Sequence, residues 1–290
     1  MTAPGRDAAL FGKLWRDARW LLLGCCLTTA AFAGVRVWLV AQLDTSRFRQ
    51  ILELLPGDFR EWSPVDFDWI VGYTGRLSFI FQEPLVNFCL FVWCIARGSD
   101  AISGELDRGT GEMLLAQPIS RRRYLMLHVV LTLIGIVAIA GSVWGGQAIG
   151  VQVISAKQTE MPSLRLPGSI GIPIPFLTPV EKFVPMRELV DPLKLVPATL
   201  VFASLGVMLA GVTTFVSSWD RYRWRTIGIA TGFYVIQALI KLLATVVPSL
   251  KFLSWLTIFS AFEPEKIVAV ADLAPEATWH FLLGPEAAAA

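Results

Sequence analysis

Long apolar runs alternate with shorter polar segments along the whole chain. Five of these runs are about 20 residues or longer and carry few charges, and a helix of that length crosses the roughly 30 Å hydrocarbon core of a membrane. The pattern predicts an all-α, polytopic membrane protein with a single transmembrane domain over 1–290. The expected spans cover 20–42, 74–96, 123–153, 195–217 and 226–247.

The segment before the first span has two different faces when it is drawn as a helix. Leu10 and Leu14 fall on the apolar face, and Lys13 and Arg16 fall opposite them. This pattern predicts a helix over 1–19 that lies along the membrane surface. The simpler alternative is a basic flank that only anchors the first span.

The polar segment 98–118 is longer than a loop between two membrane helices requires, and it mixes both signs of charge. We expect short helices that break at Gly109 and stop before Pro118. Thr110 can cap the second of them, and Glu112 then lies in its first turn, where the helix dipole favours a carboxylate.

Two further segments depart from the pattern of spans. The segment 155–192 is rich in proline and cannot form a long helix, so we expect an ordered surface loop on the outer side. The apolar stretch 252–262 is too short to span a membrane and predicts a re-entrant or interfacial segment. The region 251–290 is then either an outer segment or the start of a sixth span.

The third span contains two pairs of glycines with helical spacing. Gly141 and Gly145 form one pair, and Gly146 and Gly150 form the other. Small residues at this spacing favour close packing of helices, within one chain or between two copies, and glycine is also common in membrane helices in general.

Lysine and arginine concentrate in three short flanks: the N-terminal flank, the segment 98–123 and the turn 220–225. Together these flanks hold nearly half of the basic residues in less than a quarter of the chain. Because short basic flanks remain on the cytoplasmic side, all three predict a cytoplasmic N-terminus.

The chain lacks the usual signatures of catalysis and of metal binding. It has no Gly-x-x-x-x-Gly-Lys-Ser/Thr loop for ATP, and its four cysteines and two histidines lack the spacing of a metal site. We therefore expect no catalytic residue, no metal and no nucleic-acid partner. A transporter that relies on a separate ATPase and an assembly or receptor protein without transport activity both remain possible.

Three charged residues interrupt the apolar spans: Arg36, Glu83 and Lys241. Counted from the span ends they fall at similar depth in the outer half, where Asn87 and Gln237 share the helix faces of Glu83 and Lys241. Such residues are costly in a membrane unless they pair or serve a function. We expect Glu83 to pair with Arg36 or with Lys241 and to close a pathway; alternatively, Arg36 and Lys241 only extend to the surface.

The segment around Gly109 also resembles a known family. Its sequences Gly104-Glu105, Asp107-Arg108-Gly109-Thr110, Leu114-Leu115 and Pro118-Ile119-Ser120-Arg121 are similar to the signature of type-2 ABC exporter permeases. The nearest subgroup is the one associated with maturation of copper enzymes such as nitrous-oxide reductase.

The resemblance implies a permease in the bacterial inner (plasma) membrane, in contact with lipid, that exports its cargo as a homodimer or paired permease. A cytoplasmic ATPase subunit would bind ATP and Mg, and no cofactor would be bound by this chain. The family has six spans with the C-terminus inside, whereas this sequence supplies five clear ones. We expect the sequence to stop before or within the sixth span; the alternative is that this protein departs from the family.

The same resemblance implies a docking surface for the ATPase. Glu105, Arg108 and Glu112 are expected to face that subunit, with Leu114 and Leu115 packed below them. The complete set of expected docking residues is Gly104, Glu105, Asp107, Arg108, Gly109, Thr110, Glu112, Leu114, Leu115, Pro118 and Arg121.

Overall fold

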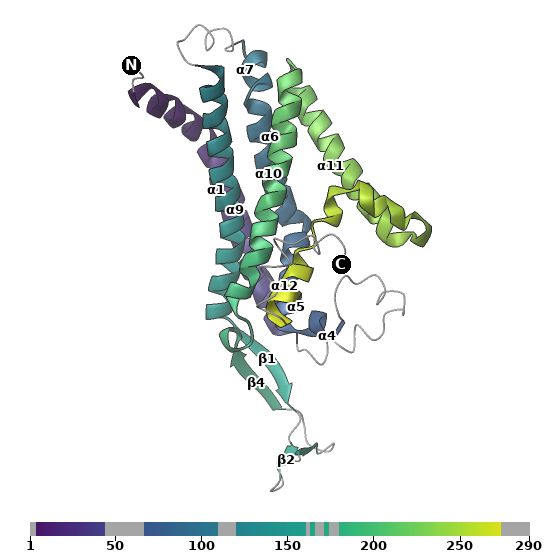
Figure 1. Cartoon of the computed structure of the whole chain (residues 1–290). Coiled ribbons are helices and arrows are strands. Elements are labelled where there is room, and N and C mark those ends of the chain that lie inside the picture. Colours follow the sequence, from purple (N-terminus) through teal and green to yellow (C-terminus); the bar gives the residue numbers. More distant parts are fainter. Residues whose placement is uncertain are drawn as a thin grey trace.

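The computed structural model describes residues 4–43, 67–109, 120–160, 163–165, 171–173 and 180–273. Within them it forms an elongated helical bundle (Figure 1). Five helices are long and apolar enough to cross a membrane, which confirms the predicted all-α, polytopic class. They cover Ala8–Gln42, Tyr73–Asp100, Arg121–Val153, Pro192–Trp219 and Arg223–Val246.

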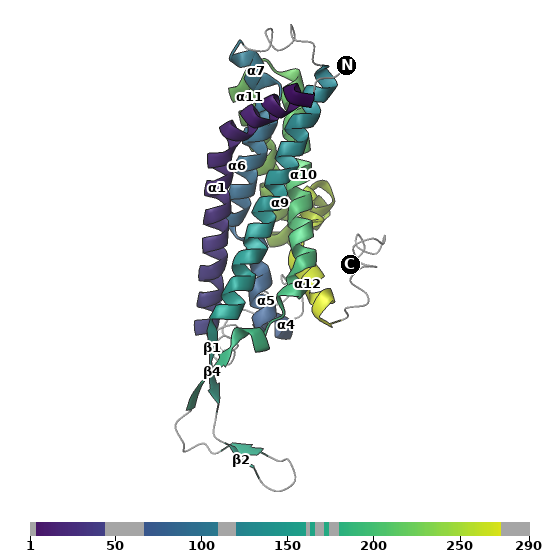
Figure 2. The same cartoon turned by 90° about the vertical axis from the view of Figure 1, so that its left-hand side faces the viewer.

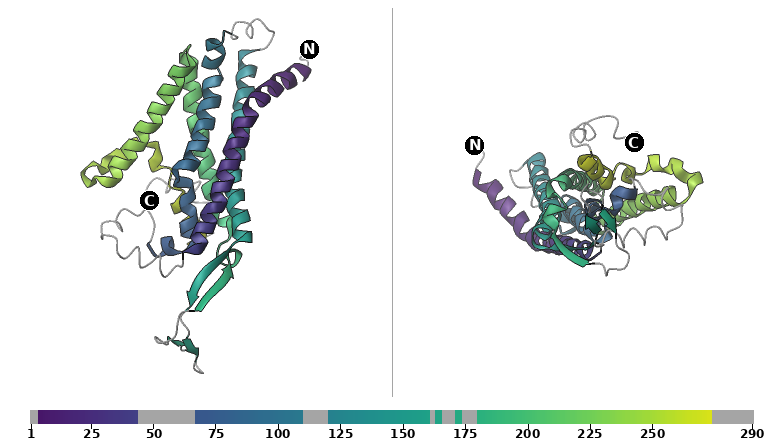
Figure 3. Two further views of the ribbon diagram at one scale, coloured as in Figure 1. Left: turned by 180° about the vertical axis from the view of Figure 1, so that it is seen from behind. Right: turned by 90° about the horizontal axis from the view of Figure 1, so that it is seen from below.

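The first helix, α1, runs without interruption from Pro4 to Gln42. The sequence predicted a surface helix followed by a separate span, and the structure joins the two. Figure 3 shows the N-terminal part of α1 bending away from the bundle. Leu14 and Ala18 are buried there, while Lys13 is exposed. This part of the continuous helix is therefore amphipathic, as expected.

The second span is broken in the middle. It consists of α5 (Tyr73–Ser78), the 3₁₀ helix η1 (Phe79–Gln82) and α6 (Pro84–Asp100). Glu83 lies between them with an extended backbone, φ −62° and ψ 130°. Pro84 explains the break, because proline lacks an N–H, clashes with the preceding turn and favours an extended residue before it.

The third span, α9, covers Arg121–Val153, and the Ser120 side chain accepts a hydrogen bond from the backbone N–H of Arg123 at its start. The helix lies alongside α1 (Figure 2). A Cβ atom at Gly146 would lie 2.5 Å from the carbonyl oxygen of Ala30. Gly146 therefore permits close approach of the two helices within one chain.

The neighbouring glycines test this packing directly. Gly146→Ala should destabilise the protein by about 1–3 kcal/mol, because the added methyl group overlaps the α1 backbone. A Cβ at Gly145 would meet nothing within 4 Å, so Gly145→Ala should be neutral or slightly stabilising through better helix propensity. Thermal melting of both variants in detergent checks the difference, and equal melting temperatures would contradict the assigned packing.

Beyond α9 the chain forms a β-hairpin, which the sequence analysis did not predict. Strand β1 (Ser155–Glu160) pairs antiparallel with β4 (Val180–Pro185), and Ala156 lies opposite Val184. Ala156 is buried against the end of the bundle, and the hairpin extends outward from there (Figure 1). A second short antiparallel pair joins β2 (Ser163–Arg165) to β3 (Gly171–Pro173).

The last two spans differ in how closely they join the bundle. The short 3₁₀ helices η2 (Met186–Glu188) and η3 (Pro192–Leu195) lead into α10 (Val196–Trp219), which packs inside the bundle. Helix α11 (Arg223–Val246) leans away from it (Figure 1) and buries few side chains.

After α11 the chain returns to the bundle through three short helices. These are η4 (Pro248–Leu256), η5 (Ile258–Ser260) and α12 (Pro264–Leu273). Helix α12 packs against α10 and α5 near the hairpin end, not far from the short helix α4 (Phe67–Val71) (Figure 1). The apolar stretch 252–262, which the sequence predicts to be re-entrant or interfacial, lies largely in η4 and η5.

Candidate functional site

The polar segment after α6 begins with a short helix, α7, which covers Ser103–Asp107. Gly109 follows with φ +69°, a backbone conformation that favours glycine over residues with a side chain. The predicted break at Gly109 is thus confirmed. The expected docking residues Thr110, Glu112, Leu114, Leu115 and Pro118 lie outside the described residues, and Arg121 is exposed at the start of α9.

The Asp100 carboxylate lies at the centre of three arginine side chains. Its Oδ1 atom accepts a hydrogen bond from Arg108 Nη1 at 2.8 Å and lies 3.5 Å from Arg223 Nη1, while Oδ2 lies 3.4 Å from Arg97 Nη1. Arg97 is only 4% exposed. Because Arg97 and Asp100 belong to α6 and Arg223 to α11, one carboxylate holds two membrane helices and the segment after α7 together.

Glu105 differs from its expected orientation. It was expected to face a partner, but it is only 6% exposed and its Oε1 atom accepts a hydrogen bond from Arg108 Nη2 at 3.0 Å. Arg108 lies three residues further along, on the same helix face, and its side chain is 43% exposed. Glu105 therefore orients Arg108, and the surface of α7 is formed by Leu106 and Asp107.

The close approach of α7 to Asp100 depends on a small residue. A Cβ atom at Gly104 would lie 2.8 Å from Asp100 Oδ1, which is closer than real Cβ contacts allow. The packing of α7 against Asp100 therefore explains why residue 104 is a glycine, independently of any partner.

Hydroxyl groups connect α7 to α10 and α11. The backbone N–H of Ser103 donates to Ser217 Oγ at 2.9 Å, and the Thr226 hydroxyl donates to Ser103 Oγ at 3.0 Å. All three side chains are fully or almost fully buried. These residues could not be identified from the sequence, because isolated serines and threonines far apart along the chain give no recognisable pattern.

A buried histidine extends this network to α9. His128 Nε2 lies 2.8 Å from the Tyr124 hydroxyl, and His128 Nδ1 lies 3.4 Å from Arg97 Nη2. Arginine can only donate, so Nδ1 accepts and Nε2 carries the hydrogen. His128 therefore couples Arg97 to the first turns of α9.

A second polar layer lies toward the hairpin end. Arg36 Nη1 and Glu83 Oε1 form an ion pair of 2.7 Å, which is one of the two predicted pairings. Lys241 instead lies 3.1 Å from Glu263 Oε1 and donates to the carbonyl oxygen of Phe259. The chain returning through η5 supplies this acid, so the alternative Glu83–Lys241 pair is absent from the described part of the chain.

Glu265 belongs to the same layer and was not identified from the sequence. It is 1% exposed, and its Oε2 atom accepts a hydrogen bond from Gln82 Nε2 at 2.6 Å. Burial, supported by the nearby negative charge of Glu263, raises the pKa of Glu265 to about 7. The carboxyl group is thus largely protonated below neutral pH, which reduces the cost of burying it.

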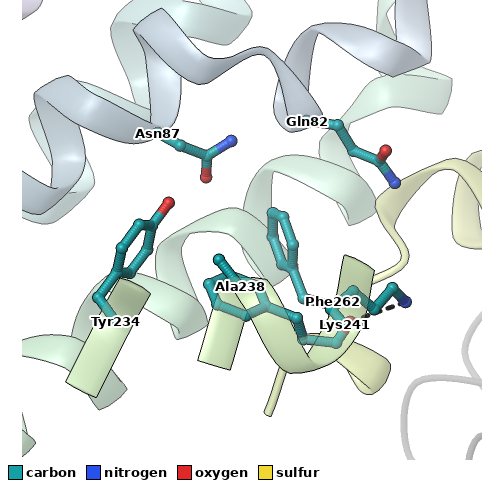
Figure 4. A pocket seen from close by; sticks show the side chains of 7 residues that line it. Gln82, Asn87, Tyr234, Ala238, Lys241 and Phe262 are labelled. Carbon is teal, nitrogen blue, oxygen red and sulfur yellow. Dashed lines mark hydrogen bonds between the residues drawn. The ribbon is translucent and has the colours of Figure 1, made fainter. Parts of the chain in front are cut away.

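A cavity of about 180 Å³ opens between α6, α11 and η5 (Figure 4). It brings together Asn87 and Lys241, two of the polar residues expected at this depth. Gln237 lies beside it, where its Oε1 atom accepts a hydrogen bond from the backbone N–H of Ile258 at 3.1 Å. The lining residues are Gln82, Asn87, Tyr234, Ala238, Lys241, Phe259 and Phe262.

A protein-family model matches most of the chain. The family model described as "ABC-2 family transporter protein" matches residues 16–265, which is most of the chain. No curated protein and no solved structure gives a significant match. Within the described residues, no group of three or more His, Cys, Asp or Glu side chains is arranged to hold a metal ion.

Proposed function

Because the chain belongs to the ABC-2 family of transporter proteins, and is therefore the membrane permease subunit of an ABC transporter, we propose that it couples to a separate ATPase through 98–118 and exports its cargo. The alternative, an assembly or receptor protein without transport activity, predicts no cargo-dependent ATPase activity.

The observation that carries this proposal is the network around Asp100. Helix α7 presents Leu106 and Asp107 to solvent on one side, and on the other side it contacts α6, α10 and α11 through buried polar groups. Arg97 and His128 extend these contacts to α9. A push on α7 from a docked ATPase would therefore reach the ends of four helices through groups that are costly to separate.

We assign ATP and Mg²⁺ to the partner subunit, because the chain has no phosphate-binding loop of the Gly-x-x-x-x-Gly-Lys-Ser/Thr type. The proposed assembly contains two permease copies and two ATPase subunits in a bacterial inner membrane. The N-terminus, α7 and the turn 220–225 lie on the cytoplasmic side, and the β1–β4 hairpin lies outside.

The exposed face of α7 provides the test of docking. Leu106→Arg and Asp107→Arg should each lower the affinity for the ATPase about tenfold or more, equivalent to roughly 1.4 kcal/mol, because they change the surface of α7 without entering its buried network. The measurement is co-purification of the permease with the ATPase encoded beside it, followed by titration in detergent.

The matched control is Glu188→Arg, a change of the same kind at an exposed residue near the hairpin. It should leave ATPase affinity unchanged, and all three variants should melt as the unmodified protein does. Docking through α7 is wrong if Leu106→Arg and Asp107→Arg bind the ATPase as tightly as Glu188→Arg.

The proposed orientation is tested by thiol labelling. In a background in which Cys25, Cys26, Cys89 and Cys94 are replaced, Phe183→Cys on the hairpin should react with an impermeant maleimide added outside intact cells. Asp107→Cys on α7 should react only after the membrane is opened. Both positions are exposed, so a reversed labelling pattern would invert the topology and remove the docking proposal with it.

We further propose that the Arg36–Glu83 pair closes the outer end of the export pathway. The support is its position, since it joins α1 to the break in the second span within the outer polar layer.

For the cargo, the resemblance of 104–121 to permeases of copper-enzyme maturation indicates the first compounds to try. Stimulation of the complex's ATPase activity by candidate cargoes in nanodiscs is the decisive assay.

A further inference from the structure

The cavity between α6, α11 and η5 contains a buried acceptor without a partner. Asn87 is 9% exposed, and its Nδ2 atom donates to the carbonyl oxygens of Phe81 at 2.8 Å and Glu83 at 3.2 Å. The Phe81 carbonyl lies in the break before Pro84, and the Glu83 carbonyl also accepts a hydrogen bond from the backbone N–H of Asn87 at 3.1 Å. The two bonds fix the orientation of the amide, so Oδ1 points away from them and has no partner in the described structure.

An unpartnered buried acceptor costs roughly 1–3 kcal/mol, and such groups in native proteins generally have a reason. Figure 4 shows Asn87 Oδ1 turned into the cavity and the Tyr234 hydroxyl pointing toward it from α11. A tyrosine hydroxyl can donate as well as accept. An acceptor and a donor therefore converge on the same space.

The remaining walls are apolar and aromatic. Tyr234 and Phe259 meet edge to face with ring centroids 5.4 Å apart, and Phe262 lies next to Phe259 with a centroid separation of 6.4 Å. Lys241 also lines the cavity, but Glu263 and the Phe259 carbonyl already bind its ammonium group. The cavity thus offers no unpaired charge to a ligand.

The volume sets the size of the ligand. A protein cavity of about 150 Å³ holds benzene, and this one measures about 180 Å³. It is large enough for one six-membered ring with a small substituent, and it is smaller than the roughly 300 Å³ at which pockets for drug-sized ligands begin.

We propose that this cavity binds a neutral, ring-sized hydroxyl compound, either a free phenol-like molecule or the hydroxyl-bearing end of a larger amphipathic molecule. The ligand hydroxyl donates to Asn87 Oδ1 and accepts from the Tyr234 O–H, and its ring packs against Phe259 and Phe262. This site does not depend on coupling to the ATPase, and binding to the permease alone measures it.

The experiment uses the full-length permease in nanodiscs with 4-fluorophenol as the probe, followed by ¹⁹F NMR. The matched probe 4-fluorotoluene has the same ring but no hydroxyl, and it should bind at least tenfold more weakly. Tyr234→Phe removes one hydrogen bond and should weaken 4-fluorophenol binding by roughly 2- to 12-fold, the range of a single hydrogen bond, with little effect on 4-fluorotoluene.

A second variant fills the cavity. Ala238→Phe should abolish saturable binding, whereas Leu239→Phe, at a neighbouring residue that is 52% exposed on the outer face of α11, should not. If Ala238→Phe fails to fold, as judged by gel filtration, Tyr234→Phe decides. Equal binding of both probes, or unchanged 4-fluorophenol binding in Tyr234→Phe or folded Ala238→Phe, would overturn the proposal.

A probe with a long alkyl tail distinguishes a free phenol-like ligand from the hydroxyl-bearing end of a larger amphipathic molecule. 4-Octylphenol places an alkyl tail beyond the opening of the cavity, toward lipid. Competition by 4-octylphenol that is much stronger than competition by phenol supports an amphipathic ligand, whereas similar competition supports a free small molecule. Absence of competition by either compound rejects the site.

Discussion

Replacing Asp100 by asparagine is expected to destabilise the folded protein by roughly 3–5 kcal/mol, the usual cost of removing one partner from a buried ion pair. Asparagine keeps the shape of the side chain but removes the charge. Arg97, almost fully buried and 3.4 Å from the carboxylate, is then left without its counter-ion. The more exposed Arg108 and Arg223 can turn toward water, so Arg97 accounts for most of the loss.

Thermal melting in detergent, with ATPase association measured in parallel, checks this expectation. Asp107→Asn is the control for thermal melting only, because Asp107 carries the same charge on the exposed face of α7 but belongs to the proposed docking surface. The double variant Arg97→Met, Asp100→Asn should recover part of the stability, since it removes the buried cation together with its partner. A melting temperature for Asp100→Asn equal to that of Asp107→Asn would show that the network contributes little.

The second large effect is expected for Glu83→Lys. This change places two cations where Arg36 and Glu83 now lie 2.7 Å apart, at a depth where an unpaired charge costs about 2.5–3.5 kcal/mol on insertion scales. The yield of folded protein should fall at least tenfold. The reciprocal double variant, Arg36→Glu with Glu83→Lys, restores an opposite-charge pair and should recover most of the yield.

Expression in membranes and gel filtration in detergent measure this result, with Glu188→Lys as the control for an equivalent change at an exposed position. Lys241 is not expected to replace Arg36, because Glu263 already pairs with it. If the double variant fails to recover and Arg36→Leu has no effect, Arg36 reaches the membrane surface by itself, and the proposed outer gate is wrong.

The spans and the main break in the polar segment could be predicted from the sequence because each depends on local chemistry. Apolar length defines the five membrane helices, and Gly109 adopts the positive φ that its residue type favours. The Arg36–Glu83 pair could also be predicted, because the rise per residue of a helix gives the depth of each residue in its span.

The network around Asp100 could not be predicted from the sequence in the same way. Arg97, Asp100 and Arg223 are charged residues near the ends of apolar runs, where such residues usually meet water. Arg97 and Asp100 share one face of α6, and only the packing of α6 against α11 brings Arg223 to them. For Glu105, the three-residue spacing to Arg108 was a usable signal for an inward pair, but the resemblance to a docking motif favoured the opposite orientation.

Glu265 and the β-hairpin show a second limit. The burial of Glu265 could not be predicted from the sequence, because the return of α12 onto the bundle depends on tertiary contacts with α10 and α5. The strands β1 and β4 flank a proline-rich stretch, and their pairing joins residues from the two ends of that stretch. Proline content excluded a helix correctly but gave no information on which residues pair.

The Arg36–Glu83 contact also has a consequence for the biogenesis of the protein. Synthesis proceeds from the N-terminus, so α1 can enter the membrane before the segment that carries Glu83 does. During that interval Arg36 lacks its counter-ion, and the face of α1 that later receives Gly146 is also uncovered. Stable insertion of the first helix therefore depends on segments that follow it into the membrane.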